Sequence, residues 1–289
     1  MTVNPAIHYF VATDRGVLRQ GCTMKTTSTT TALALALTFV GCTTDSTDSS
    51  GDDTNEIVNN LVQAGYPADD IQVVDGTVYV GNDAEVTLEA SREMIETDDS
   101  GDVKEQYHTK NLVSRSLNEI CIYDGHLKGH PVFSDGLNRA IANYNALKLT
   151  FKMVRVSKTN IDNTNCDVLI NVVFQDGAGG VSGFPAHGKP FTTVHIGRDT
   201  SSYGVNVVEW VFTHELGHTV GMRHSDYNDR AISCGGTAQN EGKGTVGAIL
   251  VPGTPSKAKA HGSIMNSCFD GSENGEFTKT DITALKKLY

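Results

Sequence analysis

The residues best suited to chemistry lie within one short stretch of the chain. His214 and His218 are four positions apart, so on a helix both imidazoles project from the same face and can bind one cation. Glu215 lies beside them, where a carboxylate can take a proton from a metal-bound water without binding the metal. Gly221 can adopt the left-handed conformation that ends a helix, which lets His224 return as a third ligand. This pattern predicts a catalytic metal site.

Zinc is the metal that this set of ligands favours, because imidazole suits borderline cations. Three protein ligands leave a fourth position open for water, which distinguishes a catalytic zinc from a closed structural one. Bound zinc lowers the pKa of that water to about 7. We therefore predict one catalytic zinc ion held by His214, His218 and His224, with Glu215 as the general base. An ordinary amphipathic helix would not require the glycine and the third histidine at these offsets.

Further along the chain, Met265 stands within Ser-Ile-Met-Asn-Ser, residues 263–267. With these motifs, residues 108–289 resemble the metzincin clan of zinc peptidases, and within it the dual-action HEIGH metallopeptidases. The resemblance implies a catalytic domain that hydrolyses internal peptide bonds of proteins or peptides, using a zinc-bound water activated by Glu215. It also implies that Met265 lies in a turn beneath the metal as an apolar floor.

The fold expected from this resemblance is α+β, with a mixed and mostly parallel sheet of four or five strands. An early helix, the zinc helix, the turn with Met265 and a C-terminal helix complete it. We expect substrate peptides to add a strand along residues 192–197, taken as the edge of the sheet.

The sequence departs from the clan at two positions. Some members place a tyrosine two residues after the methionine, where this chain has Ser267, so we assign no side chain that stabilises an oxyanion. Some relatives use an aspartate as the third ligand, and Asp226 lies two residues beyond His224. His224 fits the spacing better, so Asp226 is expected to support a histidine from outside the metal's ligands.

Apolar periodicity predicts the elements that position these residues. Three helices are indicated, at 131–147, 206–221 and 278–288. Three strands are indicated, at 149–156, 167–174 and 192–197. Thr278 and Asp281 resemble a capping box at the start of the last helix. The glycine-rich segment 176–183 is expected to form a permissive loop.

Residues 57–107 form a separate small unit, with a helix expected at 57–64 and a hairpin at 71–80. A segment of this size buries too little surface to fold alone, so we expect it to pack on the part of the chain after it. The resemblance implies that it corresponds to a propeptide, which would make the chain a zymogen. In one branch of the clan a propeptide aspartate occupies the open zinc position, and Asp83 is the candidate here; a simple turn is the alternative.

The amino terminus is typical of an exported protein. A lysine after Met24, an apolar run and a small residue before Cys42 indicate a signal peptide over residues 24–42. Either Cys42 is lipidated as in a bacterial lipoprotein, or the chain is simply secreted. Residues 1–23 are interpreted as a mis-assigned upstream extension, and 43–56 as a disordered polar linker. We expect the protein to be exported, either as a surface or outer-membrane lipoprotein or as a secreted protein. We expect it to be a monomer that contacts a membrane only through a lipid on Cys42.

Four further cysteines are an even number, which favours two disulfides in an exported chain: Cys121, Cys166, Cys234 and Cys268. Three pairings are open; we favour Cys121 with Cys166 and Cys234 with Cys268, and buried free thiols are the alternative. The net charge of -11, without a run of basic residues, argues against nucleic acid as a partner. The acidic segment 270–276 can offer oxygens to calcium, but its spacing matches no recognised calcium loop, so we expect it to face solvent.

Two other classes of function remain open. One is a surface lipoprotein without enzymatic activity, in which zinc only stabilises the fold. Such sites are normally closed by four side chains and have no use for Glu215. The other is a zinc hydrolase of amide bonds outside proteins.

Overall fold

The computed structural model describes residues 49–96, 106–242, 248–255 and 257–289. The predictions for residues 1–23, the signal peptide 24–42 and Cys42 lie outside these ranges. The helices are α1 (Ser49–Gln63), α2 (Leu88–Ile95), α3 (Pro131–Ala146), α4 (Val205–Thr219), α5 (Ala231–Cys234) and α6 (Lys279–Leu288), with 3-10 turns η1 (Ile161–Asn163) and η2 (Arg198–Tyr203). The strands are β1 (Gln72–Val74), β2 (Thr77–Val80), β3 (Ala84–Glu85), β4 (Tyr107–His108), β5 (Glu119–Tyr123), β6 (Lys152–Val156), β7 (Val168–Gln175), β8 (Gly180–Gly183), β9 (Thr193–Gly197) and β10 (Ile249–Leu250).

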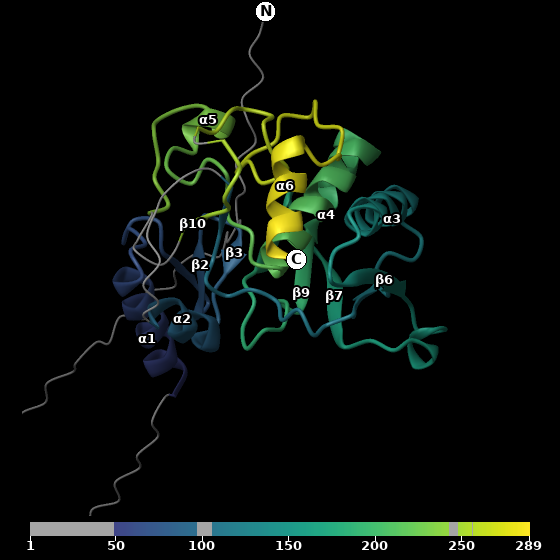
Figure 1. Cartoon of the computed structure of the whole chain (residues 1–289), viewed down its shortest axis with the longest axis horizontal. Coiled ribbons are helices and arrows are strands. Elements are labelled where there is room, and N and C mark those ends of the chain that lie inside the picture. The colour runs from purple at the N-terminus through teal and green to yellow at the C-terminus, as the bar shows by residue number, and fades with distance from the viewer. Residues whose placement is uncertain (1–48, 97–105, 243–247, 256) are drawn as a thin grey trace, which may run out of the picture.

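The fold is α+β, and its centre is an eight-stranded sheet in the order β1-β2-β3-β8-β9-β7-β5-β6 (Figure 1). In the part contributed by residues after 108, β6, β5, β7 and β9 run parallel and β8 is antiparallel to β9. This part confirms the predicted mixed, mostly parallel sheet. The other three strands come from the N-terminal unit and extend the sheet beyond β8.

The expectation that residues 192–197 form the edge of the sheet was wrong, because β9 pairs with β7 on one side and β8 on the other. β8 arises from the glycine-rich segment that was expected to be a loop. A side-chain carbon at Gly183 would lie 2.6 Å from the Glu85 carbonyl oxygen, so glycine is needed for β3 to approach. β8 is thus the outer strand of the part after residue 108, and β3 pairs with it in parallel.

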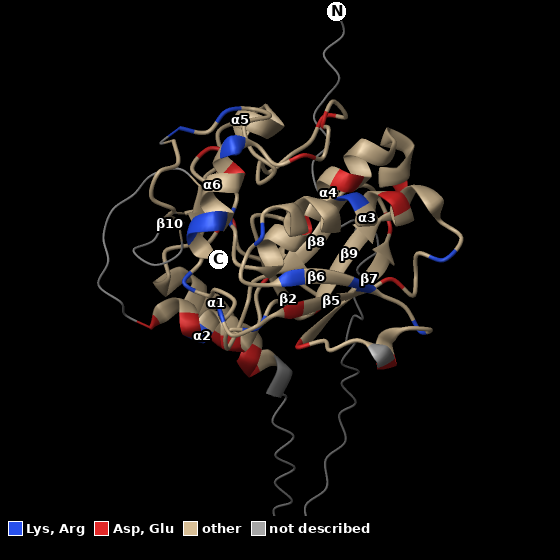
Figure 2. Cartoon of the chain, turned by 45° about the vertical axis from the view of Figure 1, so that its right-hand side comes forward, with Lys and Arg blue, Asp and Glu red and all other residues tan. Residues whose placement is uncertain are grey.

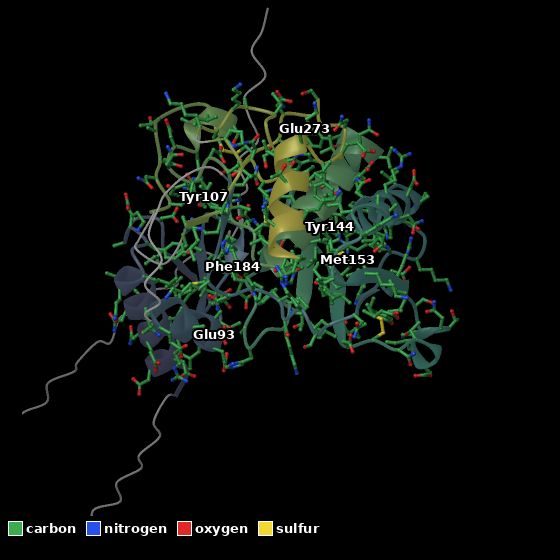
Figure 3. The ribbon with its side chains drawn as sticks, viewed as in Figure 1. Glu93, Tyr107, Tyr144, Met153, Phe184 and Glu273 are labelled. Atoms are coloured by element: carbon green, nitrogen blue, oxygen red, sulfur yellow. A yellow bond between two sulfur atoms is a disulfide. The ribbon has the colours of Figure 1, made fainter. Side chains whose placement is uncertain are left out.

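Helices α3 and α4 pack against each other, and α4 also packs on β8 and β9. Residues 207–219 of α4 are buried on every side of the helix, so it forms the middle of the main core. The Tyr144 hydroxyl of α3 donates to the Thr213 carbonyl of α4 at 2.9 Å (Figure 3). The predicted capping box is present at the start of α6, where Thr278 and Asp281 bond reciprocally.

The N-terminal unit of the described chain, residues 49–96, packs α1 on α2 and on β2 (Figure 1). The linker expected over 43–56 is wrong for residues 49–56, which are helical. Asp52 in the first turn suits the positive end of the helix, and the helix buries Ile57 and Leu61. The hairpin turn is as predicted, with positive φ values of 50° at Asp75 and 84° at Gly76.

The N-terminal unit shares its apolar core with the rest of the chain through Phe184, which follows β8 (Figure 3). Acidic residues are concentrated on α1 and α2 (Figure 2). The contact that was expected between this unit and the rest of the chain is therefore present in the structure.

Two disulfides cross-link the part after residue 108, with the pairing that we favoured. Cys121–Cys166 joins β5 to the segment before β7, and Cys234–Cys268 joins α5 to the segment that follows Met265. Across the described ranges, none of the helices has the length and apolar character needed to cross a membrane.

Candidate metal centre

Helix α4 and the turn that follows it bring the three histidines together. His214 and His218 lie one turn apart near the end of α4. Gly221 has φ of 97°, and a side-chain carbon there would lie 2.5 Å from the Asn111 carbonyl oxygen. Only glycine fits this left-handed turn and this close approach. The chain then returns so that His224 faces the helix, as the sequence predicted for Gly221.

The Nε2 atoms of the three histidines converge on one point. The Nε2 atom of His214 lies 3.0 Å from that of His218 and 3.3 Å from that of His224. A tetrahedral zinc with N–Zn bonds of about 2.0–2.1 Å requires ligand nitrogens about 3.3 Å apart. All three side chains are buried. The geometry of this donor set therefore fits zinc.

The second ring nitrogen of each histidine has an acceptor. His214 Nδ1 donates to the Ile264 carbonyl oxygen at 2.8 Å, and His218 Nδ1 donates to that of Met222 at 2.8 Å. Because a carbonyl only accepts, Nδ1 carries the proton and Nε2 keeps the lone pair that a metal needs. Burial lowers the pKa of His218 well below its usual value, which also favours the neutral imidazole.

His224 differs, because its Nδ1 lies 2.6 Å from the Glu241 carboxylate. Burial disfavours the charged imidazole, but the carboxylates of Asp83 and Glu241 on its two sides raise the pKa of His224 well above its usual value. Burial likewise opposes ionisation of Glu241, yet His224, Arg223 and Arg230 lower its pKa. The third histidine is thus held by a charged partner.

Glu215 is fully buried in α4, next to His214. Neither carboxylate oxygen has a hydrogen-bond partner among the described residues. A side-chain carbon at Gly180 would lie 2.6 Å from Glu215 Oε1, so glycine in β8 leaves room for the carboxylate. Burial, reinforced by the charge of Asp83, raises the pKa of Glu215 well above its usual value. A buried carboxylate without partners fits a role in accepting a proton from a water at this point.

Asp83 of the N-terminal unit reaches into the same point. Its Oδ2 lies 3.0 Å from His224 Nε2 and 3.5 Å from His214 Nε2, and its Oδ1 lies 3.7 Å from His218 Nε2. Asp83 has no solvent exposure. Burial opposes its ionisation, but the charge of His224 and the hydrogen bond from His224 hold the pKa of Asp83 well below its usual range. Together, these four residues can offer a metal one buried carboxylate and three imidazoles.

Met265 lies against the C-terminal end of α4, where its sulfur is 2.5 Å from the position of a side-chain carbon at Gly217. Its carbonyl oxygen accepts from the Ser225 backbone N–H at 2.7 Å, which joins this turn to the chain beside His224. Met265 is buried, with 2% exposure.

Asp226, expected to support a histidine, contacts serines instead. It accepts hydrogen bonds from Ser233 Oγ and from the Ser267 backbone N–H and Oγ. Glu241 is the carboxylate in contact with His224. Ser267 Oγ also lies 3.4 Å from Glu241, so Asp226 is connected to the histidine only through other side chains.

Sequence reasoning did not find Glu241, Arg223 or Arg230. Glu241 is 17 positions from His224, in a segment after α5 without helix or strand. No spacing rule connects a carboxylate at that distance to a histidine, so no signal in the sequence identified it.

A second group of metal-ligating residues lies in the acidic segment that was considered for calcium. His261, Asp270 and Glu273 bring their ligand atoms within 4.8 Å of one another. Glu273 accepts hydrogen bonds from the backbone N–H groups of Asp270 and Gly271, and Asp270 accepts from that of Ser272. These carboxylates therefore accept hydrogen bonds from the backbone of their own loop.

Comparison with known proteins adds to this geometry. Residues 78–289 match the family model described as dual-action HEIGH metallo-peptidase. A structure of myroilysin is 16% identical with a TM-score of 0.39, covering 63% of this chain and 98% of that one. A crystal structure of myroilysin is 17% identical with a TM-score of 0.37, and the match covers 62% of this chain and 86% of that one. The crystal structure of metalloproteinase-II from Bacteroides fragilis is 10% identical with a TM-score of 0.33, and the match covers 82% of this chain and 69% of that one.

Proposed function

Because this chain belongs to the dual-action HEIGH metallopeptidase family, we propose that it is a zinc-dependent endopeptidase that hydrolyses internal peptide bonds of proteins. The family match supports a metallopeptidase, and the three converging Nε2 atoms beside a buried Glu215 carry the finer proposal. A zinc ion bound by His214, His218 and His224 supplies acidification of the attacking water and polarisation of the scissile carbonyl.

Glu215 acts as the general base. It accepts a proton from the attacking water and then donates it to the leaving amine. Its burial and its raised pKa suit both steps, because a carboxylate in an apolar setting is a better base than one in water. A purely structural zinc would give no reason for a buried carboxylate without hydrogen-bond partners at this position.

Substrate is proposed to bind along β8 rather than β9. Main-chain hydrogen bonds at a sheet edge are the usual means of binding an extended peptide. In this structure the edge is taken by β3, with Ser182 N donating to the Asp83 carbonyl oxygen at 2.9 Å. Substrate therefore requires β3 to leave.

Residues 57–107 are proposed to be an inhibitory propeptide, which makes the full chain a zymogen. Asp83 takes the open metal position, and β3 takes the place of substrate on β8. Residues 108–289 are the proposed catalytic domain. Cleavage between the two parts, followed by departure of the first, would expose the site.

The protein is further proposed to act outside a bacterial cell, after export directed by residues 24–42. Disulfides persist in oxidising compartments, and the two in this structure support that location. Cys42 is the proposed lipid attachment point, and the alternative remains secretion without a lipid.

The test is cleavage of casein or a quenched peptide pool by residues 43–289 with zinc, before and after limited proteolysis. Glu215→Ala and a chelator are the controls. Activity that is lost in both controls is the expected result. A protein that binds zinc but cleaves no peptide even after proteolysis would overturn the peptidase function, and cleavage of cell-wall fragments instead would assign a non-protein substrate.

A further inference from the structure

Two buried arginines lie between the candidate metal centre and the N-terminal unit. The Arg223 guanidinium lies 4.5 Å from the centre of the Tyr66 ring and 3.5 Å from the Glu241 carboxylate. Arg230 Nη1 lies 3.2 Å from Asp70 Oδ1 and 3.6 Å from Glu241 Oε1. The N-terminal unit therefore brings a carboxylate, Asp70, to a cation that belongs to the catalytic part.

The N-terminal unit adds a negative charge at this contact. On the catalytic side, Arg223 and Arg230 both contact the carboxylate of Glu241, which also contacts His224. Asp70 gives Arg230 a second carboxylate. When the N-terminal unit departs, Arg230, which is only 6% exposed in this structure, loses that partner. The guanidinium then keeps only the Glu241 contact described above, which Glu241 shares with Arg223 and His224, and a substrate carboxylate of opposite charge can take the vacated place.

The position of Asp70 is close to where a peptide bond would be cleaved. Asp70 Oδ2 accepts a hydrogen bond from the Gly81 backbone N–H at 3.1 Å. A side-chain carbon at Gly81 would lie 3.2 Å from the His224 ring. Asp83, whose carboxylate lies among the three histidines, follows two residues later. A substrate side chain near the scissile bond can therefore reach the same guanidinium.

Arg230 is held in place by the catalytic part itself. Its backbone N–H donates to the Gln239 carbonyl at 2.9 Å, and Nη2 donates to Gln239 Oε1 at 3.1 Å. The Cys234–Cys268 disulfide fixes α5, which begins at the next residue, to the segment after Met265. A guanidinium held in this way loses little freedom when it binds a carboxylate, which favours selective recognition.

We propose that Arg230 determines substrate specificity by binding an acidic side chain of the substrate in the place that Asp70 takes in this structure. The proposal rests on the peptidase function proposed above and on release of the N-terminal unit. An endopeptidase cleaves within a chain, so the carboxylate comes from an aspartate or glutamate side chain. Arginine suits this role because its planar fork binds a carboxylate through two parallel hydrogen bonds.

The test uses the full chain after complete limited proteolysis, with zinc, on quenched peptides that are acetylated and amidated. The peptides come in matched pairs that differ at one position flanking the scissile bond, where one member has Asp or Glu and the other has the corresponding amide, Asn or Gln. Because both ends are blocked, the acidic side chain supplies the only carboxylate. At one position we expect kcat/KM for the acidic peptide to exceed that for the amide by about tenfold or more, as for a charged hydrogen bond. Arg230→Gln should bring the ratio of kcat/KM for the acidic peptide to kcat/KM for the amide peptide close to one, with both values measured on the same variant at saturating zinc so that a change in overall activity cancels.

Arg198→Gln is the matched control, because Arg198 stacks on Phe174 at 4.4 Å and contacts none of these groups. It should keep the acidic preference. Thermal unfolding of each variant establishes that it is folded, and Arg230→Met, which keeps the apolar stem, replaces a glutamine variant that does not fold. Wild type without an acidic preference, or a preference that survives in the Arg230 variant, overturns the subsite. Failure of wild type to cleave any peptide would instead overturn the peptidase function.

Discussion

At the scale of single residues, His224 is the histidine that depends on a charged partner. The other two histidines direct Nδ1 at backbone carbonyls, which carry no formal charge. Glu241 fixes the ring of His224 and increases the electron density that Nε2 offers to a metal. Glu241 is therefore a positioning residue, since it acts through the histidine and has no contact with the expected water.

Glu241→Gln should weaken zinc binding about 10- to 100-fold, because the amide keeps the shape of the side chain but loses its charge. A competition titration with a chromophoric chelator measures this directly, without relying on peptide cleavage. Glu209→Gln serves as control, because Glu209 is a buried carboxylate of α4 whose partners are Asn143 and Arg139. Equal zinc affinity in wild type and Glu241→Gln would contradict the assignment.

The clustering of the three histidines beside Glu215 could be predicted because these residues lie close together in sequence, where the helical repeat and the turn at Gly221 fix their relative directions. Glu241 and Arg230 could not. They lie on an irregular segment whose path is fixed by Cys234–Cys268 and by bonds to Gln239, and neither follows from local spacing. Asp226 is nearer to His224 in sequence than Glu241, yet it faces away toward serines.

At the scale of elements, α6 holds the turn that contains Met265. Asp281 caps the helix through the Thr278 backbone N–H, and it also accepts from Ser263 Oγ and from the Ile264 backbone N–H. Ile264 in turn provides the carbonyl that orients His214. One buried carboxylate thus connects the last helix to the metal centre.

Thr278→Ala should lower the free energy of unfolding by about 1 kcal/mol, the usual effect of losing a helix cap. Asp281→Ala should cost about 2–4 kcal/mol, because several buried donors then lose their acceptor. Thr283→Ala is the control, since Thr283 is a half-buried residue of the same helix whose hydroxyl donates to the Lys279 carbonyl and takes no part in the cap. Denaturant unfolding measures all three, and equal losses for Thr278 and Asp281 would contradict the wider role of the aspartate.

Elements with strong periodicity, such as α4, α6, β7 and β9, could be predicted to within a few residues. β8 could not, because glycine has little preference for strands and its use here reflects close contact with Glu215 and with β3. α2 is only eight residues long, too short for its apolar repeat to be distinguished from a loop.

At the scale of the whole molecule, the N-terminal unit covers the metal centre through two separate sets of contacts. The strand β3 pairs with β8 and brings Asp83 to the histidines. In the second set, Tyr66 contacts Arg223 and Asp70 contacts Arg230. The sequence predicted that the unit packs on the rest of the chain. It did not predict the second set of contacts, because Tyr66 and Asp70 lie in a loop that approaches the arginines only in the folded chain.

Because the two sets are separate, removing Asp83 alone should release only part of the inhibition that we propose for this unit. We expect uncleaved Asp83→Ala precursor to cleave a quenched peptide at least about tenfold faster than uncleaved wild type, since the open metal position is then free for water. It should stay slower than the processed enzyme, because β3 still occupies the edge that substrate needs. Gel analysis during the assay establishes that the precursor stays intact. Asp69→Ala removes an exposed carboxylate of the same unit and should leave latency unchanged. No increase in rate would show that Asp83 does not block the metal, whereas a rate equal to that of the processed enzyme would show that β3 does not block substrate.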